Sequence, residues 1–260
     1  MEVTLFRPRS AVLAALAAVV FLAPGSAFAA AEIHRLNIAI SGTPTQVNAR
    51  DFNEGLDFYN RVTLAPHGFE SLDKVKFTWL FETEVRYFVT RNLSINAGMG
   101  HERASTSKEY LPALSQSINV RAEILTVPVH VGASYYLQPY NQGDFQARVF
   151  AGGGLVQYTH SRVTFLQQLS GVDPVTSAQL GGSFKTGATQ DAPGYYAEGG
   201  VHMFFAARYS VLLSAHYRSG ELANLLDEGT GQVFINPQTN QPFKLDVGGI
   251  GFRMAVVVGL

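Results

Sequence analysis

Apolar and polar residues alternate with a period of two along most of the chain. The alternation is clearest over residues 75–89, where the odd positions are apolar or aromatic and the even positions include charged residues. It resumes over residues 93–103, after a short polar stretch at 90–92. A period of two is typical of a β-strand with one apolar and one polar face. Two such segments joined by a short turn predict a hairpin.

Further segments show the same alternation and predict six more strands. They cover residues 32–42, 118–137, 145–165, 194–205, 209–219 and 244–260. Pro128 lies inside one of them, and because proline within a strand is normally restricted to an edge or a bulge, we expect a bulge near it. Glycines 152–154 lie inside the next strand, where they permit bending or a close approach of neighbouring strands in a small barrel.

The connections between these strands alternate between short turns and long loops. The short turns are at 90–92, 138–144 and 206–208, and the long loops at 43–74, 104–117, 166–192 and after Ser219. All short turns therefore fall at one end of the sheet, together with both ends of the chain. Barrels of bacterial outer membranes show this asymmetry.

The first long loop contains a predicted helix. Phe52, Leu56, Tyr59 and Thr63 recur at roughly helical spacing, with Asn48 or Asp51 near the start of the segment. Such a helix can be an ornament of the loop or a lid across the mouth of the barrel, and the sequence leaves both interpretations open.

Residues 1–29 predict a secretory signal peptide. Arg7 and Arg9 precede an apolar run from Ala11 to Pro24, and the small residues at 27–29 fit a cleavage site. The run is too short to span a bilayer, which disfavours the alternative of an uncleaved anchor. We expect residues 30–260 to form a single domain, in which any membrane-spanning segments are strands.

Charge and composition exclude several classes of function. The formal net charge of -1 argues against a nucleic-acid partner, which requires a basic surface. The absence of cysteine from an exported chain excludes a disulfide framework, thiolate chemistry and a cysteine-ligated zinc site.

The chain resembles the small eight-stranded outer-membrane β-barrel proteins of the outer membrane protein A, X or W type, the outer membrane protein beta-barrel domain group. The resemblance rests on the signal peptide, the eight alternating segments, the strand TVPVHVGASYYL with its turn QPYNQGD, and a final strand that reaches the last residue. It implies an all-β fold, an eight-stranded antiparallel up-and-down transmembrane β-barrel with short periplasmic turns and long extracellular loops. It also implies a monomer in the bacterial outer membrane, in contact with outer-membrane lipid, lipopolysaccharide and the outer-membrane assembly machinery.

If the apolar strand face contacts lipid, the polar face lines a lumen only just wide enough to be filled by side chains. Unpaired charges buried there would cost several kcal/mol each, so we expect arginine, glutamate and histidine side chains to pair and plug the barrel. The expected lumen residues are Arg35, Lys76, Glu82, Glu84, Arg86, His130, Arg148, Glu198, His202, His216, Arg218 and Arg253. The aromatic residues expected at the membrane interfaces are Trp79, Tyr87, Tyr135, Tyr195, Tyr209 and Tyr217.

Two other arrangements of such a barrel are open. If the lumen charges line a continuous gap, the protein is a narrow passive channel for small solutes. If the apolar faces point inward around a ligand, it is a soluble barrel of the lipocalin type, although this explains the alternation of short turns and long loops less well.

The sequence gives little support for a catalytic site. His216 and Ser219 resemble the base and nucleophile of the outer-membrane lipid A deacylases, but those enzymes separate the two by one residue. Here two residues intervene, which places the side chains on opposite strand faces unless a bulge lies between them. His130 and His202 lack a second metal ligand at a recognisable spacing. We predict a structural or surface-interaction role, with no enzyme activity, no metal and no cofactor.

Overall fold

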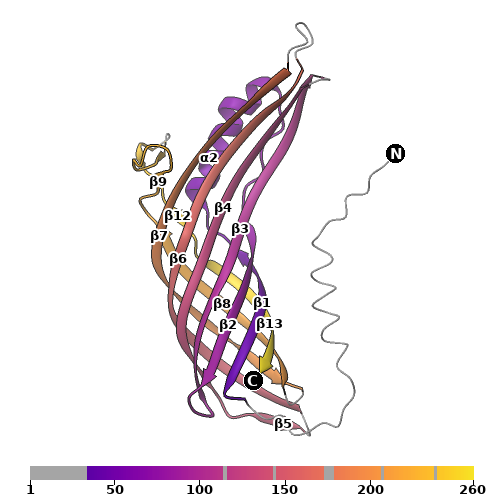
Figure 1. Ribbon diagram of the computed structural model, residues 1–260, viewed down its shortest axis with the longest axis vertical. Helices are drawn as coiled ribbons and strands as arrows, with labels where there is room; N and C mark the ends of the chain where they lie inside the picture. The colour runs from indigo at the N-terminus through magenta and orange to yellow at the C-terminus, as the bar shows by residue number, and fades with distance from the viewer. Residues whose placement is uncertain (1–33, 114–115, 143–144, 173–178, 206–207, 237–238) are drawn as a thin grey trace, which may run out of the picture.

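Antiparallel strands make up most of the protein. The computed structural model describes residues 34–113, 116–142, 145–172, 179–205, 208–236 and 239–260 (Figure 1). The predicted signal peptide lies outside the described residues, as do 143–144 and 206–207 of two predicted turns. Within the described part of the chain, no helix is long and apolar enough to cross a membrane.

Eight strands close into a ring in the order of the sequence. Each pairs antiparallel with the next, and the last pairs with both its predecessor and the first, which confirms the predicted eight-stranded antiparallel up-and-down barrel. The strands are β1 (Leu36–Gln46), β2 (Phe77–Phe88), β3 (Leu93–Ala113), β4 (Gln116–Tyr136), β6 (Phe145–Val172), β7 (Gln179–Phe204), β8 (Tyr209–Leu222) and β13 (Gly249–Gly259). The short strands at their margins are β5 (Tyr140–Gln142), β9 (Leu226–Asp227), β10 (Ile235–Asn236), β11 (Gln241–Pro242) and β12 (Leu245–Asp246).

Two predicted loops are wrong, because most of residues 104–117 and 166–192 belong to strands. β3, β4, β6 and β7 continue far beyond the other four strands and project from one end of the ring (Figure 1). Along this projection many outward residues are polar, as at Ser105, Ser107 and Glu109 of β3, although Leu111 is exposed there as well. A strand with a polar outer face lacks the apolar alternation on which the prediction depended.

The predicted bulge lies close to Pro128. Pairing between β4 and β6 shifts between Leu125 and Val127, whose partners are Arg162 and Thr159, so the extra residue lies on β6. His160 of β6 has a φ of 50° there, and its backbone N–H donates to the Asp191 carboxylate at 3.0 Å. The bulge therefore bends the neighbouring strand opposite the proline.

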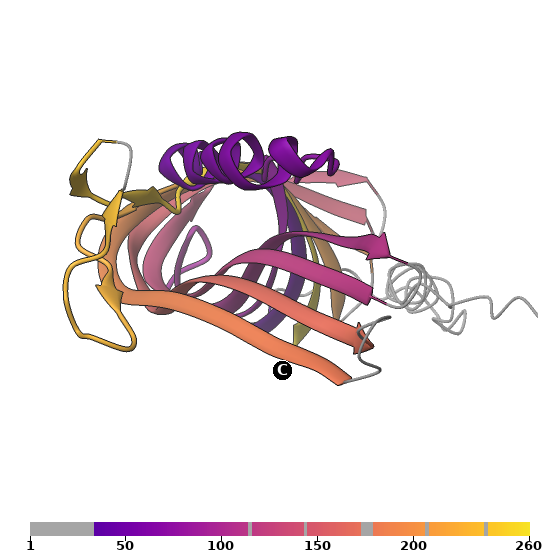
Figure 2. The ribbon, with the colours of Figure 1, turned by 90° about the horizontal axis from the view of Figure 1, so that it is seen from above.

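The predicted helix is present as α2 (Arg50–Tyr59), which continues through a π-helical turn, η1 (Asn60–Leu64), and a 3₁₀ turn, η2 (Ala65–His67). Figure 2 shows it lying along one side of the projecting strands. Its apolar face enters a cluster of buried residues, which we call the upper core. The upper core comprises Val47, Ala49, Phe52, Leu56, Leu64, Leu72, Val75, Ala104, Tyr110, Val120, Ala122, Ile124, Val156, Tyr158, Val163, Ala188, Ala192, Leu222, Leu225, Phe243, Leu245 and Val247.

Two asparagines attach the helical segment to the chain that follows it. The Asn53 side chain donates to the Val75 carbonyl at 2.9 Å and accepts from its N–H at 2.8 Å. Asn60 makes the same pair of bonds with Leu72, at 3.0 and 2.8 Å. These bonds satisfy backbone groups that have no strand partner, and so fix the return path toward β2.

The inside of the ring is layered. The upper core fills the projecting end, and a second apolar cluster lies near the short turns. This lower cluster comprises Ala39, Phe88, Tyr136, Phe150, Leu212, Ala255 and Val257. Buried polar and charged residues of the same strands occupy the space between the two apolar layers.

Candidate functional site: a charge cluster inside the ring

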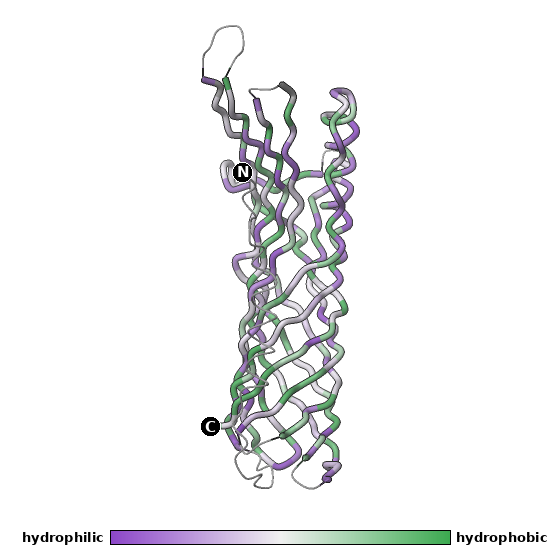
Figure 3. The backbone as a smooth tube through the Cα atoms, turned by 90° about the vertical axis from the view of Figure 1, so that its right-hand side faces the viewer, coloured by the Kyte–Doolittle hydropathy of each residue, from purple (hydrophilic) through white to green (hydrophobic). Residues whose placement is uncertain are grey.

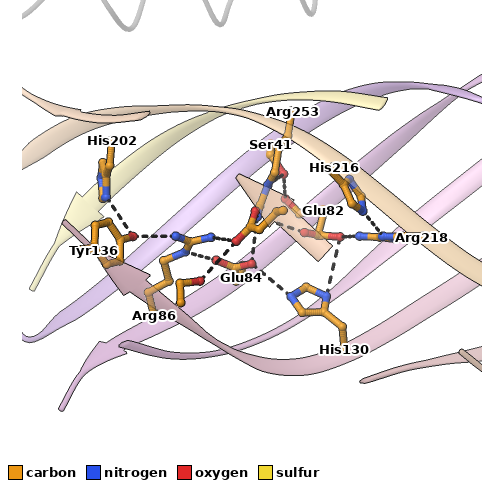
Figure 4. A network of polar contacts seen from close by, with 12 residues as sticks. Ser41, Glu82, Glu84, Arg86, His130, Tyr136, His202, His216, Arg218 and Arg253 are labelled. Carbon is orange, nitrogen blue, oxygen red and sulfur yellow. Dashed lines mark hydrogen bonds and ion pairs between the residues drawn. The ribbon is translucent and has the colours of Figure 1, made fainter. Parts of the chain in front are cut away.

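The charge cluster consists of eight buried residues that point into the ring (Figure 4). Successive inward positions of β2 supply two carboxylates and a guanidinium, and the other strands supply the rest. The members are Glu82, Glu84, Arg86, His130, Glu198, His216, Arg218 and Arg253. Because three arginines face three glutamates, the formal charges cancel when the histidines are neutral.

Arg253 of β13 is the centre of the cluster. Its Nη1 lies 2.9 Å from Glu84 Oε2 and 3.3 Å from Glu198 Oε2, and its Nη2 lies 3.2 Å from Glu82 Oε1. Its Nε donates to the Ser41 hydroxyl at 3.1 Å. One guanidinium thus joins carboxylates from β2 and β7 across the ring.

Arg86 extends the cluster toward the short turns. It forms an ion pair with Glu84, and its Nη2 lies 2.5 Å from Glu198 Oε1. Its Nη1 donates to the Tyr136 hydroxyl at 2.7 Å, and that hydroxyl lies 3.3 Å from His202 Nδ1. Tyr136 therefore links the charges to the lower apolar cluster, of which its ring is a member.

Arg218 and two histidines form the other side of the cluster. Arg218 pairs with Glu82 through Nη2 and donates from Nε to His216 Nε2 at 2.6 Å. His216 Nε2 accepts this bond, so that nitrogen carries no proton. His130 Nε2 lies 3.1 Å from Glu84 Oε2.

Little space remains between these side chains. The cavity bounded by Tyr196 and all members of the cluster except Arg86 has a volume of about 10 Å³. A single water molecule needs roughly 10–15 Å³ of such volume. The charged groups at this level contact one another directly.

Most predicted lumen residues lie in the cluster, but two predictions are wrong. Arg35 and Lys76 are exposed, because each stands one residue before the start of its strand, where the chain leaves the ring. His202 is buried and joins the cluster only through Tyr136, and its Nε2 lies 2.8 Å from the Ser210 hydroxyl.

Arg148 is buried but lies apart from the ion pairs. Its Nη1 donates to the Arg91 carbonyl at 2.6 Å and its Nη2 to the Leu137 carbonyl at 3.3 Å. Its guanidinium lies 5.2 Å from the centre of the Tyr136 ring. Arg148 thereby attaches the turn between β2 and β3, which contains Arg91, to the start of the turn after β4 at Leu137.

The sequence-based set of lumen residues omitted Ser41, Tyr136 and Tyr196. Tyr136 lies on the same face of β4 as His130, six residues earlier. From Thr126 to Tyr136, every side chain on that face is buried inside the ring, and Gly132 has no side chain. The alternation alone therefore could have identified it.

Inward glycines make room for the cluster. A Cβ added at Gly132 would lie 2.3 Å from the Tyr196 hydroxyl oxygen and 2.4 Å from the Gly153 carbonyl oxygen. In a narrow barrel, small residues alternate with large ones so that the interior side chains fit.

Substituting Gly132→Ala is therefore expected to destabilise the folded barrel by about 1–3 kcal/mol through overpacking. Urea titration in detergent micelles, followed by tryptophan emission, measures the change. Gly181→Ala is the matched control, because nothing lies within 4 Å of the added Cβ. Equal midpoints for the two variants would contradict the tight packing inferred for Gly132.

Glu82, Glu84 and His130 bring potential metal-ligand atoms within 4.8 Å of one another. The same two carboxylates already pair with Arg86, Arg218 and Arg253. A cation would have to replace these arginines, so the donor set fits an ion-pair cluster better than a metal centre.

His216 and Ser219 lie on opposite faces of β8. Pairing with β7 is unbroken from Ser210 to Gly220, so no bulge brings the two side chains together. His216 is buried in the cluster, whereas Ser219 is partly exposed. His216 and Ser219 therefore do not form a general base next to a nucleophile.

The outer face of the ring carries a continuous band of exposed apolar side chains, which we call the outer belt. Hydrophobic positions are denser in this part of the tube than along the projection (Figure 3). Members of the outer belt include Ile40, Phe81, Val85, Ile95, Met99, Val129, Val131, Val149, Leu155, Leu213, Phe252 and Met254.

All six predicted interfacial aromatics are exposed on the outer face. Tyr87, Tyr135 and Tyr209 lie next to the short turns, and Trp79, Tyr195 and Tyr217 lie toward the projecting end. Eight residues separate Trp79 from Tyr87 along β2. At about 3.3 Å per residue and a strand tilt of roughly 40°, this separation spans about 20 Å of the barrel axis.

No protein-family model matches the sequence, and no curated protein matches it. Among solved structures, the chain is similar to the N-terminal β-barrel domain of OprF of Pseudomonas aeruginosa, at 11% identity and a TM-score of 0.36 over 85% of this chain and 96% of that one. It is also similar to the attachment invasion locus protein Ail of Yersinia pestis, crystallised with the heparin analogue sucrose octasulfate (9%, TM-score 0.36, 86% and 95%). A third is the outer membrane protease OmpT of Escherichia coli (10%, TM-score 0.28, 86% and 95%). The assignment of the fold rests on the closed ring of strand pairs.

Proposed function

We propose that the protein is an integral outer-membrane barrel with a closed lumen and a structural or surface-interaction role. The neutral charge cluster, with about 10 Å³ of free space, is the observation that carries the closed lumen. The outer belt supports the membrane location, because apolar bands flanked by aromatic residues on both sides are typical of outer-membrane barrels. A soluble lipocalin-like barrel would carry the opposite pattern, with its apolar faces inside.

The layers above and below the charge cluster also oppose a channel. An ion that enters from the short turns would meet the rings of Phe88, Tyr136 and Phe150. Beyond the cluster it would meet the upper core, closed on one side by α2. The free energy needed to dehydrate an ion in an apolar layer is large. The lumen charges stabilise such an ion little, because they are already paired with one another.

The surface-interaction role is supported by the projection of β3, β4, β6 and β7. It rises past the outer belt on the end opposite the short turns, which in an outer-membrane barrel faces the cell exterior. Many of its outward residues are polar, and a shallow groove of about 600 Å³ crosses it between Glu109, Asn119 and Gln168. A paired sheet of this kind presents a largely polar surface outside the membrane.

Planar-bilayer recordings of the purified full chain test the closed lumen. We expect no stable conductance steps from the wild type. The triple variant Arg86→Ala, Tyr136→Ala and Phe150→Ala removes three large buried side chains from the charge cluster and the lower apolar cluster and is expected to raise conductance. Stable ion-sized steps from the wild type would refute the proposal and favour the passive channel. Heat-modifiable gel migration of each sample verifies that the barrel is folded.

A further inference from the structure

A groove of about 380 Å³ runs over the outer face of β1, β2 and β3. Its apolar walls are Ile40, Phe81 and Met99, and its upper end reaches His101. Gly42 forms part of its floor, because a Cβ there would lie 3.7 Å from the rings of Phe81 and Trp79. The groove exists where glycine leaves the outer belt without a side chain, and its apolar walls suit a hydrocarbon chain.

Arg103 follows the groove on β3, and Arg121 of the neighbouring strand β4 shares a carboxylate partner with it. Arg103 is the cross-strand partner of Trp79, two residues beyond the Phe81–His101 pair. Arg103 binds Glu123 with both Nε and Nη2, at 2.8 and 2.9 Å, and Arg121 Nη2 binds the same carboxylate at 2.8 Å. Two guanidinium groups share one carboxylate, which leaves one positive charge in excess.

The arginine pair can reach a ligand. The side chains of Arg103 and Arg121 are 47% and 38% exposed, and Glu123 beneath them only 19%. Among the described residues only Glu123 pairs with these two guanidinium groups, so their remaining N–H groups can donate outward. A phosphate accepts such bonds in the geometry that guanidinium groups favour.

The level of these arginines matches the headgroups of a membrane. Along the outer face of β4, Leu125, Val127 and Val129 belong to the apolar part, and the next outward residues are Glu123 and Arg121. Trp79 stands at the same boundary on β2, as tryptophan does at membrane–water interfaces. The boundary is the one on the projecting side, and so faces the outer leaflet.

We infer that this surface binds lipopolysaccharide, with one acyl chain of its lipid A moiety in the groove and a lipid A phosphate on Arg103 and Arg121. The inference rests on the proposed outer-membrane location. It adds a defined site to what would otherwise be a uniform lipid contact. The apolar groove complements an acyl chain of a phosphorylated lipid, and the arginine pair complements its phosphate.

Trp79 is the single tryptophan of the chain and lies beside Arg103, so its emission reports on the site. The full chain is folded into phosphatidylcholine nanodiscs and titrated with bisphosphorylated lipid A. We expect a saturable change of Trp79 emission. The double variant Arg103→Ala and Arg121→Ala is expected to bind about tenfold more weakly or worse, and Gly42→Leu, which fills the groove, also more weakly.

Glu123→Gln provides a test in the opposite direction. It removes the competing carboxylate, keeps both arginines, and is expected to tighten binding. Arg50→Ala is the matched control, because this exposed cation lies on α2, which does not line the groove, and it pairs only with Glu54 among the ion pairs of the described residues. It is expected to bind as the wild type does.

Three results would overturn the inference. They are equal affinity of wild type and the double arginine variant, equal binding of lipid A that lacks both phosphates, and equal binding of phosphatidylglycerol. The last would assign the site to anionic phospholipid in general. A protein that does not insert into nanodiscs at all would contradict the membrane location instead, and gel migration distinguishes that failure from a loss of lipid A binding.

Discussion

Replacing Arg253 by methionine is expected to destabilise the folded barrel by about 3–5 kcal/mol, the usual cost of removing one partner from a buried ion pair. Methionine fills a comparable volume, so the packing loss is small. The charge loss is large, because three buried glutamates then face only Arg86 and Arg218. Urea titration in detergent micelles, with the folded fraction read from gel migration and Trp79 emission, measures the change.

The control for this prediction is an ion pair on the surface. Lys244 Nζ lies 3.3 Å from Glu221 Oε1, with both side chains more than half exposed. Lys244→Met is expected to change stability by no more than about 0.5–1 kcal/mol, since exposed pairs contribute little. Adding Glu84→Gln to Arg253→Met restores neutrality and is expected to recover part of the loss. Equal urea midpoints for Arg253→Met and Lys244→Met would show that the cluster does not depend on charge pairing.

The composition of the charge cluster could be predicted because strand geometry is regular. Once the aromatic face of β2 is assigned to the outside, Glu82, Glu84 and Arg86 must point inward, since a one-residue shift reverses both faces. The same reasoning failed at Arg35 and Lys76. Alternation in the sequence does not mark where pairing with the neighbouring strand stops, and a residue just beyond that point is free to turn toward water.

The projecting parts of the strands could not be predicted, for two physical reasons. Outside the outer belt the inner strand faces pack against the upper core and the outer faces are exposed, so polar residues replace the apolar outer residues that mark the membrane-spanning parts. The bulge at His160 also changes the register of β6: outward residues are odd below it, as at Leu155, and even above it, as at Arg162. A single period of two cannot describe both halves of that strand.

The partners within the cluster could not be predicted either. The sequence supplies inward residues of each strand, but which ones meet depends on the stagger of strands that are far apart along the chain. Arg253 and Glu84 are 169 residues apart and lie 2.9 Å from each other at Nη1 and Oε2. The presence of both charge signs was visible in advance, but the neutral sum of the cluster and the central position of Arg253 were not.

The double variant Phe52→Ala and Leu56→Ala is expected to release α2 from the upper core. Each truncation of a buried side chain of this kind costs about 2–5 kcal/mol. A ten-residue helix is marginal without packing, so the pair of changes removes most of what holds it. Limited trypsin digestion measures the release as faster cleavage at Arg61, an exposed site within the helical segment. Val62→Ala is the control, because that side chain is 52% exposed.

The same variant decides whether α2 is a lid. All eight ring strands pair without it, so gel migration of the barrel is expected to stay unchanged when the helix is released. The charge cluster also lies in a separate layer and keeps its ion pairs, because none of them involves α2. We therefore expect the variant to remain non-conducting in planar bilayers. Conductance that appears together with trypsin sensitivity would instead place the seal of the barrel at the helix, with the charge cluster as a permeable layer beneath it.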